Sequence, residues 1–223
     1  MSQSSFFKYG TIISITVLLC ISYFFIRNYI INNGDILGIK SFLNACEEGG
    51  IDSIKPSLRN TPQKLKMSYF KMLITSHYGN HSWIASTYTS FIGNFGYMQY
   101  KLPIPIYIGY TFIIVTGIIG YIIKIKNIIK TKKELLLNIS LIFCLIIPII
   151  LSLKYSYSTD YQPQGRYIYP MFTSFIIIIT LGYEKIINTL KNHKKLTNII
   201  IYSTSIFIII SFLIATKIFI NSI

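Results

Sequence analysis

Asp160 and Arg166 are the residues of this sequence best placed to do chemistry. They set a carboxylate and a guanidinium six residues apart, just before the uncharged segment from Tyr167 to Tyr183. Charges beside a membrane are costly unless they pair or meet a ligand. Arg166 can bind a phosphate through its planar fork, or serve as a structural ion pair or a snorkelling anchor. Asp160 can act as a base, orient Arg166 or lie solvated in a turn.

The elements that must position these two residues are membrane helices. The chain has 223 residues, of which 52% are hydrophobic, and a mean hydropathy of +0.54, which excludes an ordinary soluble domain. A helix needs about 20 residues to cross the hydrocarbon core, with a lower limit of ~17. The uncharged segments of about that length are Thr11–Ile26, Leu102–Ile123, Leu135–Leu153, Tyr167–Tyr183 and Leu196–Thr216. The first reaches spanning length by including residues 27–31, with Arg27 snorkelling. We therefore predict an all-α, polytopic integral membrane protein with five transmembrane helices.

Lysines in the short loops predict the orientation of these helices, because short cytoplasmic loops are rich in Lys and Arg. The basic loops follow the second and the fourth span, and they carry Lys124, Lys126, Lys130, Lys132, Lys133, Lys185, Lys191, Lys194 and Lys195. Both loops should be cytoplasmic, which gives an N-in/C-out topology. The loop that holds Asp160 and Arg166 and the long segment 32–101 then lie outside, in a multi-pass protein of the plasma membrane.

Three regions follow from this topology: an N-terminal transmembrane anchor (1–31), an extracytoplasmic segment with an interfacial helix (32–101) and a four-helix transmembrane region (102–223). A cleaved signal peptide is the alternative for the first span, but no small-residue cleavage site follows it. The net charge of +14 comes from lysines that flank spans. Anionic lipid headgroups explain these lysines, so we expect membrane lipid and no nucleic acid as partner.

The segment 32–101 is too long for a bare connection and should contain structure of its own. Asn33–Asp35 predicts a turn, and Cys46–Asp52 predicts a solvated acidic turn. Thr61–Pro62 predicts a helix start. The apolar face of that helix would hold Leu65, Tyr69, Met72 and Leu73. It would be either an interfacial amphipathic helix or a small helix packed on its neighbours.

Metal and cofactor sites are not expected. His77 and His81 have the i, i+4 spacing of two metal ligands, but Gly79–Asn80 between them should break a helix. The cysteines are scattered and form neither a disulfide framework nor a metal site. The aromatic run from Trp83 to Tyr100 predicts either a headgroup-level belt or one wall of a sugar or isoprenoid pocket.

Three sequence blocks in this order resemble a known group of proteins. Tyr23–Gly38 resembles an aromatic-x-x-Arg-Asn…Gly-Asp-Pro-Leu-Gly element, Ser90–Pro103 a Ser-Phe-Trp-Gly-x-Phe-Gly-Trp…Leu-Pro element, and Gln164–Pro170 a Gln-Gly-Arg-Tyr-hydrophobic-hydrophobic-Pro element. Together they are similar to the C-terminal half of a bacterial family of multi-pass membrane proteins of unknown function, which is related to the GT-C class of lipid-linked-sugar glycosyltransferases. The departures from the patterns are Ile36, Ile92 and Tyr97.

The resemblance implies that the chain acts in cell-envelope glycan assembly with a polyprenyl-phosphate sugar as donor. It implies phosphate-binding roles for Gln164, Arg166 and Tyr167, with Arg27 and Asn28 as further candidates. The catalytic carboxylate of the GT-C class lies in an N-terminal half, so the chain would be a fragment or the second half of a split enzyme, inactive alone. It would then need an N-terminal half or another membrane partner subunit.

A non-enzymatic alternative fits the same residues. In that case the chain is an accessory or scaffold subunit of an envelope polysaccharide system, and Arg166 matters for assembly rather than turnover.

Overall fold

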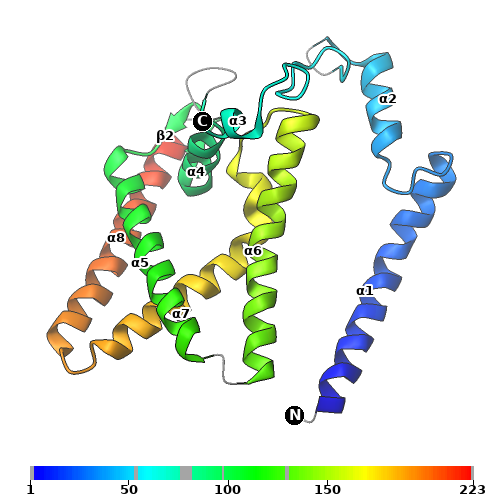
Figure 1. Ribbon diagram of the computed structural model, residues 1–223. Helices are drawn as coiled ribbons and strands as arrows, with labels where there is room; N and C mark the ends of the chain where they lie inside the picture. Colours follow the sequence, from blue (N-terminus) through cyan, green and yellow to red (C-terminus); the bar gives the residue numbers. More distant parts are fainter. Residues whose placement is uncertain (1–2, 53–54, 76–81, 97, 129–130, 222–223) are drawn as a thin grey trace. The chain divides into compact units, whose positions relative to one another are not determined.

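The computed structural model describes residues 3–52, 55–75, 82–96, 98–128 and 131–221. These residues are 76% helical. The elements are α1 (Gln3–Ile31), α2 (Ile39–Gly49), α3 (Tyr69–Ile74), α4 (Trp83–Gly93), β1 (Asn94–Phe95), β2 (Tyr100–Lys101), α5 (Ile104–Ile128), α6 (Lys132–Ser158), the 3-10 helix η1 (Gly165–Met171), α7 (Phe172–Thr189) and α8 (Lys194–Ile220). Figure 1 shows the elements along the chain.

Among the residues that the structure describes, five helices are long and apolar enough to cross a membrane, which agrees with the predicted number of spans. They are Lys8–Ile31, Ile104–Ile125, Lys132–Ser158, Gly165–Thr189 and Lys194–Ile220. Four of them cover the corresponding predicted segment and extend a few residues beyond it, whereas the second begins at Ile104, two residues after the predicted start at Leu102. The protein is therefore a helical, multi-pass membrane protein by architecture, whereas the N-in/C-out orientation remains a prediction.

The chain forms two compact units, Met1–Asn60 and Thr61–Ile223. The first holds α1 and α2, joined by a tight corner. Residues 32–34 form the predicted turn: Asn33 and Gly34 have φ of 48° and 91°, and the Gly34 amide donates to the Tyr29 carbonyl at 2.9 Å. Asp35 then accepts a 2.9 Å hydrogen bond from the Ser41 amide in the first turn of α2.

The second unit is built around the crossing of α5 and α7 (Figure 1). Glycines allow the two backbones to touch, since a Cβ on Gly182 would lie 1.8 Å from the Gly117 carbonyl oxygen. Tyr121, Leu141 and Ile178 form the buried core beside this crossing, and they come from α5, α6 and α7. Within lipid, small residues at helix contacts favour such close packing.

Contacts between neighbouring elements define the two ends of the helix bundle in the second unit. At one end the ring centroids of Phe95 and Phe219 lie 6.1 Å apart, which brings the C-terminal end of α8 to the hairpin β1–β2. At the other end Lys124 of α5 forms a 2.5 Å ion pair with Glu184 of α7. The Asp160–Arg166 loop belongs to the same end as the hairpin, because η1 packs on α4.

The predicted helix start at Thr61–Pro62 is wrong. Residues 62–66 form turns, and Lys66 has a left-handed φ of 52°, which interrupts any helix there. The helix α3 begins only after Ser68, whose hydroxyl accepts from the Lys71 amide at 3.2 Å. Tyr157 of α6 holds this segment in place: its hydroxyl donates to the Met67 carbonyl, and its ring stacks on Tyr69 at 3.8 Å.

The short helix α3 packs against its neighbours in the second unit. Met72 is fully buried, and α3 contacts α4. Phe70 and Ile74 of the same helix are 72% and 56% exposed, so the choice between a packed and an interfacial helix stays a prediction. The only tryptophan of the sequence, Trp83, is likewise buried at 5% exposure.

Candidate functional site: a polar cavity above an apolar one

Two of the three sequence blocks meet at Gly165. Its amide donates a 2.7 Å hydrogen bond to the Ser90 Oγ of α4. Ser90 in turn donates to the Ser86 carbonyl at 2.6 Å, within its own helix. The approach is so close that a Cβ on Gly165 would lie 2.3 Å from the Phe91 amide nitrogen. Gly165 therefore brings the start of η1 directly against the last turns of α4.

A polar cavity of about 400 Å³ lies at this contact. Its lining residues come from α4, the hairpin and the start of η1, and they are Ser90, Asn94, Met98, Gln164, Gly165, Arg166 and Tyr169. The cavity thus joins the predicted site residues Gln164 and Arg166 to a part of the chain more than sixty residues upstream. Amide, hydroxyl and guanidinium groups predominate in this lining, which suits a polar or anionic ligand.

The hairpin that closes the cavity is held by Tyr107 of α5. The Tyr107 hydroxyl lies 2.7 Å from Asn94 Oδ1 and 2.8 Å from the Gly93 carbonyl oxygen. It also accepts a 3.1 Å hydrogen bond from the Leu102 amide, on the returning side of the hairpin. Asn94 pairs with Lys101 across the two strands. One phenol therefore fixes both sides of the hairpin and orients the Asn94 amide.

Arg166 is exposed and reaches into a chain of polar groups. Its guanidinium donates a 3.1 Å hydrogen bond to the Tyr167 hydroxyl and lies 5.0 Å from the centre of the same ring. The Tyr167 hydroxyl donates to Gln162 Oε1. Gln162 Nε2 then donates to Asp160 Oδ2 at 2.5 Å. Tyr167 and Gln162 thus connect the carboxylate to the guanidinium.

Arginine retains donors for a ligand in this arrangement. A guanidinium has five N–H donors in a fixed fork. Among the described residues it donates one side-chain hydrogen bond, to Tyr167. Arg166 also lines the polar cavity. The remaining N–H donors can bind a phosphate there. Arginine often binds phosphate through two parallel N–H···O hydrogen bonds.

Asp160 is not among the residues that line this cavity. Its neighbour Tyr161 is half-buried, and burial raises the pKa of the Tyr161 phenol, which therefore stays neutral. The chain of hydrogen bonds from Asp160 through Gln162 and Tyr167 to Arg166 supports the interpretation that Asp160 orients Arg166 indirectly.

Arg27 and Asn28 belong to the unit Met1–Asn60 and are described within it. Arg27 is exposed near the end of α1. Asn28 is 7% exposed, because the corner between α1 and α2 covers it: a Cβ on Gly38 would lie 3.5 Å from Asn28 Nδ2. Asn28 therefore packs within this corner, and its predicted phosphate-binding role stays a prediction.

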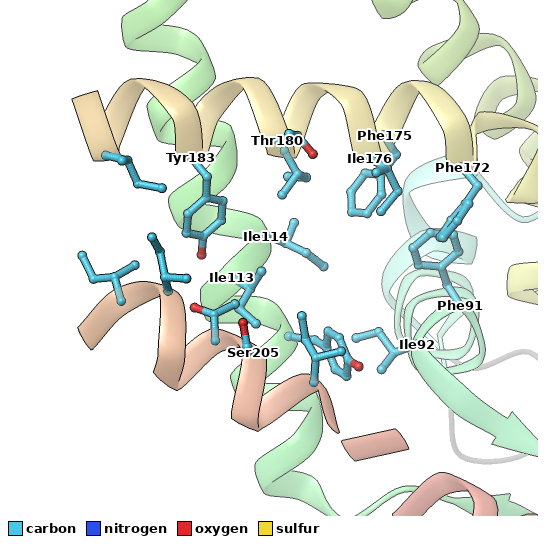
Figure 2. Close-up of a pocket in the computed structure, with 17 residues that line it drawn as sticks. Phe91, Ile92, Ile113, Ile114, Phe172, Phe175, Ile176, Thr180, Tyr183 and Ser205 are labelled. Atoms are coloured by element: carbon cyan, nitrogen blue, oxygen red, sulfur yellow. The ribbon is translucent and has the colours of Figure 1, made fainter. Parts of the chain in front are cut away.

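An apolar cavity of about 560 Å³ lies between α5, α7, α8 and the end of α4 (Figure 2). Its lining residues are Phe91, Ile92, Tyr110, Ile113, Ile114, Phe172, Phe175, Ile176, Ile179, Thr180, Tyr183, Ile187, Ile200, Ile201, Thr204, Ser205 and Ile208. Figure 2 shows Phe91 and Phe172 at one end and Tyr183 toward the other. The phenylalanine end belongs to the side of the unit where the polar cavity lies.

The two cavities share a wall of aromatic rings. Tyr169 lines the polar cavity, and its ring centroid lies 5.8 Å from that of Phe91 and 6.4 Å from that of Phe172. Both phenylalanines line the apolar cavity. Ser90 and Phe91, which are consecutive, likewise face one cavity each. An amphipathic ligand with a polar head and an apolar chain matches this pair of cavities.

Sequence reasoning missed Ser90, Asn94 and Tyr169 as site residues. Ser90 and Asn94 lie in the block Ser90–Pro103 and Tyr169 in the block Gln164–Pro170, so their place in these blocks was the available signal. Phe91 belongs to the aromatic run for which a pocket wall was one of the two predictions. The predicted metal-ligand pair His77 and His81 lies outside the described residues. Within the described ranges, no group of three His, Cys, Asp or Glu side chains can hold a metal ion.

No protein family, curated protein or solved structure matches this chain.

Proposed function

We propose that this protein binds a polyprenyl-phosphate sugar and forms the donor-binding part of a membrane glycosyltransferase of the GT-C type. The observation that carries the proposal is the position of Arg166 in a polar cavity that shares an aromatic wall with an apolar cavity between the spans. The sugar phosphate would occupy the first cavity and part of the prenyl chain the second. The setting would be the outer face of a bacterial plasma membrane, in cell-envelope glycan assembly.

Arg166 is the group that would hold the phosphate. A guanidinium binds phosphate oxygens in pairs, and its charge stabilises the phosphate that leaves during glycosyl transfer. Gln164 and Asn94 line the same cavity and offer amide donors to a sugar or phosphate. Tyr167 supports Arg166 through its ring and its hydroxyl.

Asp160 would act as a positioning residue rather than as the base. Inverting glycosyl transfer needs a base that removes a proton from the acceptor hydroxyl. Asp160 reaches Arg166 only through Gln162 and Tyr167 among the hydrogen bonds described above, and it does not line the polar cavity. The base would therefore come from outside the cavity lining, for example from an N-terminal half or a partner subunit.

A second candidate function is an accessory or scaffold subunit of an envelope polysaccharide system. The observation that favours it is that none of the seven residues lining the polar cavity is a carboxylate. Such a site can bind a lipid phosphate without performing acid–base chemistry. The two candidates share the ligand and differ in whether the bound lipid reacts.

Binding to the full chain in nanodiscs tests the shared ligand. Native mass spectrometry would compare a polyprenyl phosphate with the corresponding neutral polyprenol. Arg166→Ala should weaken binding of the phosphate by about 10- to 100-fold, because hydrogen bonds to charged groups contribute about 1.5–3 kcal/mol. Lys154→Ala is the matched control. It removes an exposed positive charge near the C-terminal end of α6, and Lys154 does not line the polar cavity. Equal binding of phosphate and alcohol, or an unchanged Arg166→Ala affinity, would refute the phosphate site.

The response of native cells to Arg166→Ala separates the enzyme from the scaffold. An enzyme part should lose glycan transfer while the amount of assembled complex stays constant. A scaffold should instead lose recovered complex, and transfer should fall only in proportion. Lys154→Ala should change neither quantity.

A further inference from the structure

The helix α2 has a clear apolar face that the protein leaves exposed. Ile39, Phe42, Leu43 and Cys46 have the spacing i, i+3, i+4 and i+7, which places them on one side of the helix. Phe42 is 62% exposed and Ile39 57% exposed, Leu43 and Cys46 are half-buried, and no residue of α2 is fully buried. The opposite side carries polar residues, among them Asn44 and Glu48.

The corner between α1 and α2 places this face beside the end of a membrane span. The span Lys8–Ile31 ends only eight residues before α2 begins. Within those residues the Asn32 amide donates to the Asn28 carbonyl at 2.8 Å, and the Gly38 amide to the Asp35 carbonyl at 3.0 Å. Gly38, with φ of 69°, lies against the Asn28 side chain. The first turn of α2 therefore follows the end of the span Lys8–Ile31 after a single tight corner.

The corner itself presents further apolar surface. Ile36 is 48% exposed and Leu37 58% exposed. They line a shallow groove together with Ile39 and Leu43 of α2. The apolar face of the helix is thus continuous with the apolar surface of the corner.

We propose that α2 is an interfacial helix that inserts Ile39, Phe42, Leu43 and Cys46 into the headgroup–acyl boundary of a phospholipid bilayer. A helix of this kind lies in the plane of the membrane and buries its apolar face about 5–10 Å deep. The occupant is lipid because the face begins directly after the candidate span Lys8–Ile31, whose apolar window is not buried by protein. This inference concerns the first unit and is independent of the polar cavity.

The charges of α2 indicate that burial of apolar surface, rather than attraction to anionic lipid, drives this insertion. The helix carries one lysine, Lys40, and two glutamates, Glu47 and Glu48. Its charge is therefore not basic, in contrast to the net charge of +14 for the whole chain. The insertion should persist in about 1 M NaCl, where the Debye length is only ~3 Å.

A native cysteine allows a direct test. In the full chain with C20S and C144S, Cys46 would carry a bimane label on the apolar face. The matched control is Asn44→Cys in the C20S/C46S/C144S background, which places the same label on the polar face of the same helix. Both proteins would be reconstituted into nanodiscs of phosphatidylcholine with or without bromines on the acyl chains.

The label at position 46 should be quenched at least about threefold more by brominated lipid than the label at position 44, and aqueous iodide should give the reverse order. High salt should leave both results unchanged. Equal quenching at the two positions would overturn the proposal. So would a label at position 46 that neither quencher reaches, because a protein surface would then cover the face, or an insertion that disappears in high salt.

Discussion

The amide of Gly165 donates a 2.7 Å hydrogen bond to the hydroxyl of Ser90, which lies 75 residues earlier in the chain. This bond joins the start of η1 to α4. It brings Arg166 and Asn94 to the same polar cavity. The absence of a side chain at Gly165 is what permits the approach, since the Phe91 backbone occupies the space where a Cβ would lie. The candidate site therefore depends on a single close backbone contact.

Gly165→Ala should destabilise the second unit by about 1–3 kcal/mol, the range for overpacked sites. The added methyl group would meet the Phe91 backbone, which cannot rotate away as a side chain can. Thermal unfolding in detergent would measure the loss. Gly49→Ala is the control, because nothing lies within 4 Å of its Cβ position. Equal stability of the two variants would contradict the close contact.

Gly182→Ala should disrupt the crossing of α5 and α7 more severely than Gly165→Ala disrupts its own contact. The methyl group would lie 1.8 Å from the Gly117 carbonyl oxygen of α5. Gly120 of α5 is equally close to α7, since a Cβ there would lie 2.3 Å from the Gly182 carbonyl oxygen. The two helices would have to separate. Gly10→Ala, in an open position of α1, should leave thermal stability in detergent unchanged. A Gly182→Ala protein as stable as Gly10→Ala would show that the helices do not touch here.

Tyr121→Phe should cost about 1 kcal/mol of stability. The substitution removes a buried 2.7 Å hydrogen bond from the Tyr121 hydroxyl to Asn138 Oδ1, which links α5 to α6. Tyr202→Phe serves as the control, because Tyr202 is 65% exposed. Unfolding of both proteins in mixed micelles with increasing denaturing detergent would compare them. No difference between the variants would mean that the interhelical bond contributes nothing.

Tyr167→Phe should weaken polyprenyl-phosphate binding by about fivefold, which corresponds to about 1 kcal/mol for one hydrogen bond. The aromatic ring beside Arg166 remains, so the loss should be smaller than for Arg166→Ala. Asp160→Asn should act through the same chain of hydrogen bonds. The double variant should therefore bind about as well as Tyr167→Phe alone. Additive losses in a binding titration would show that Asp160 acts by a separate route.

Acid should loosen the corner between α1 and α2. The Ser41 amide, which donates to Asp35, lowers the pKa of that carboxyl below its ordinary value. A carboxyl with a lower pKa in the folded state stabilises the fold when it is ionised. This stabilisation is complete above the unfolded pKa of about 4 and disappears as the pH falls through the folded-state pKa. NMR of the protein in micelles should show that the Asp35 carboxyl has a lower pKa than an aspartate in a short unstructured peptide. In Asp35→Asn the Ser41 amide signal should not change over this pH range, and a titration that persists there would assign the effect to another group.

The amino-acid sequence by itself determined the number and the approximate position of the five membrane helices. Apolar runs without charges leave no alternative in lipid, because each backbone group must be satisfied within its own helix. The turn after α1 also followed from local residues, since Asn33 and Gly34 readily adopt positive φ. The Gln164–Pro170 motif was recognisable as a site candidate because it sets a charge at the mouth of a span. All these features depend on residues that are adjacent in the sequence.

Only the tertiary structure decided which segments complete the site. Ser90 and Asn94 join Arg166 through contacts across many residues, and such pairings depend on side-chain packing that no local pattern encodes. The same reason explains the wrong helix start at Thr61: Tyr157 of α6 contacts Gln63, Met67 and Tyr69 and so holds the segment before α3 in a non-helical conformation, which overrides its local helical pattern. The amphipathic helix instead begins at Ile39, after a corner that Asp35 and Gly38 hold closed.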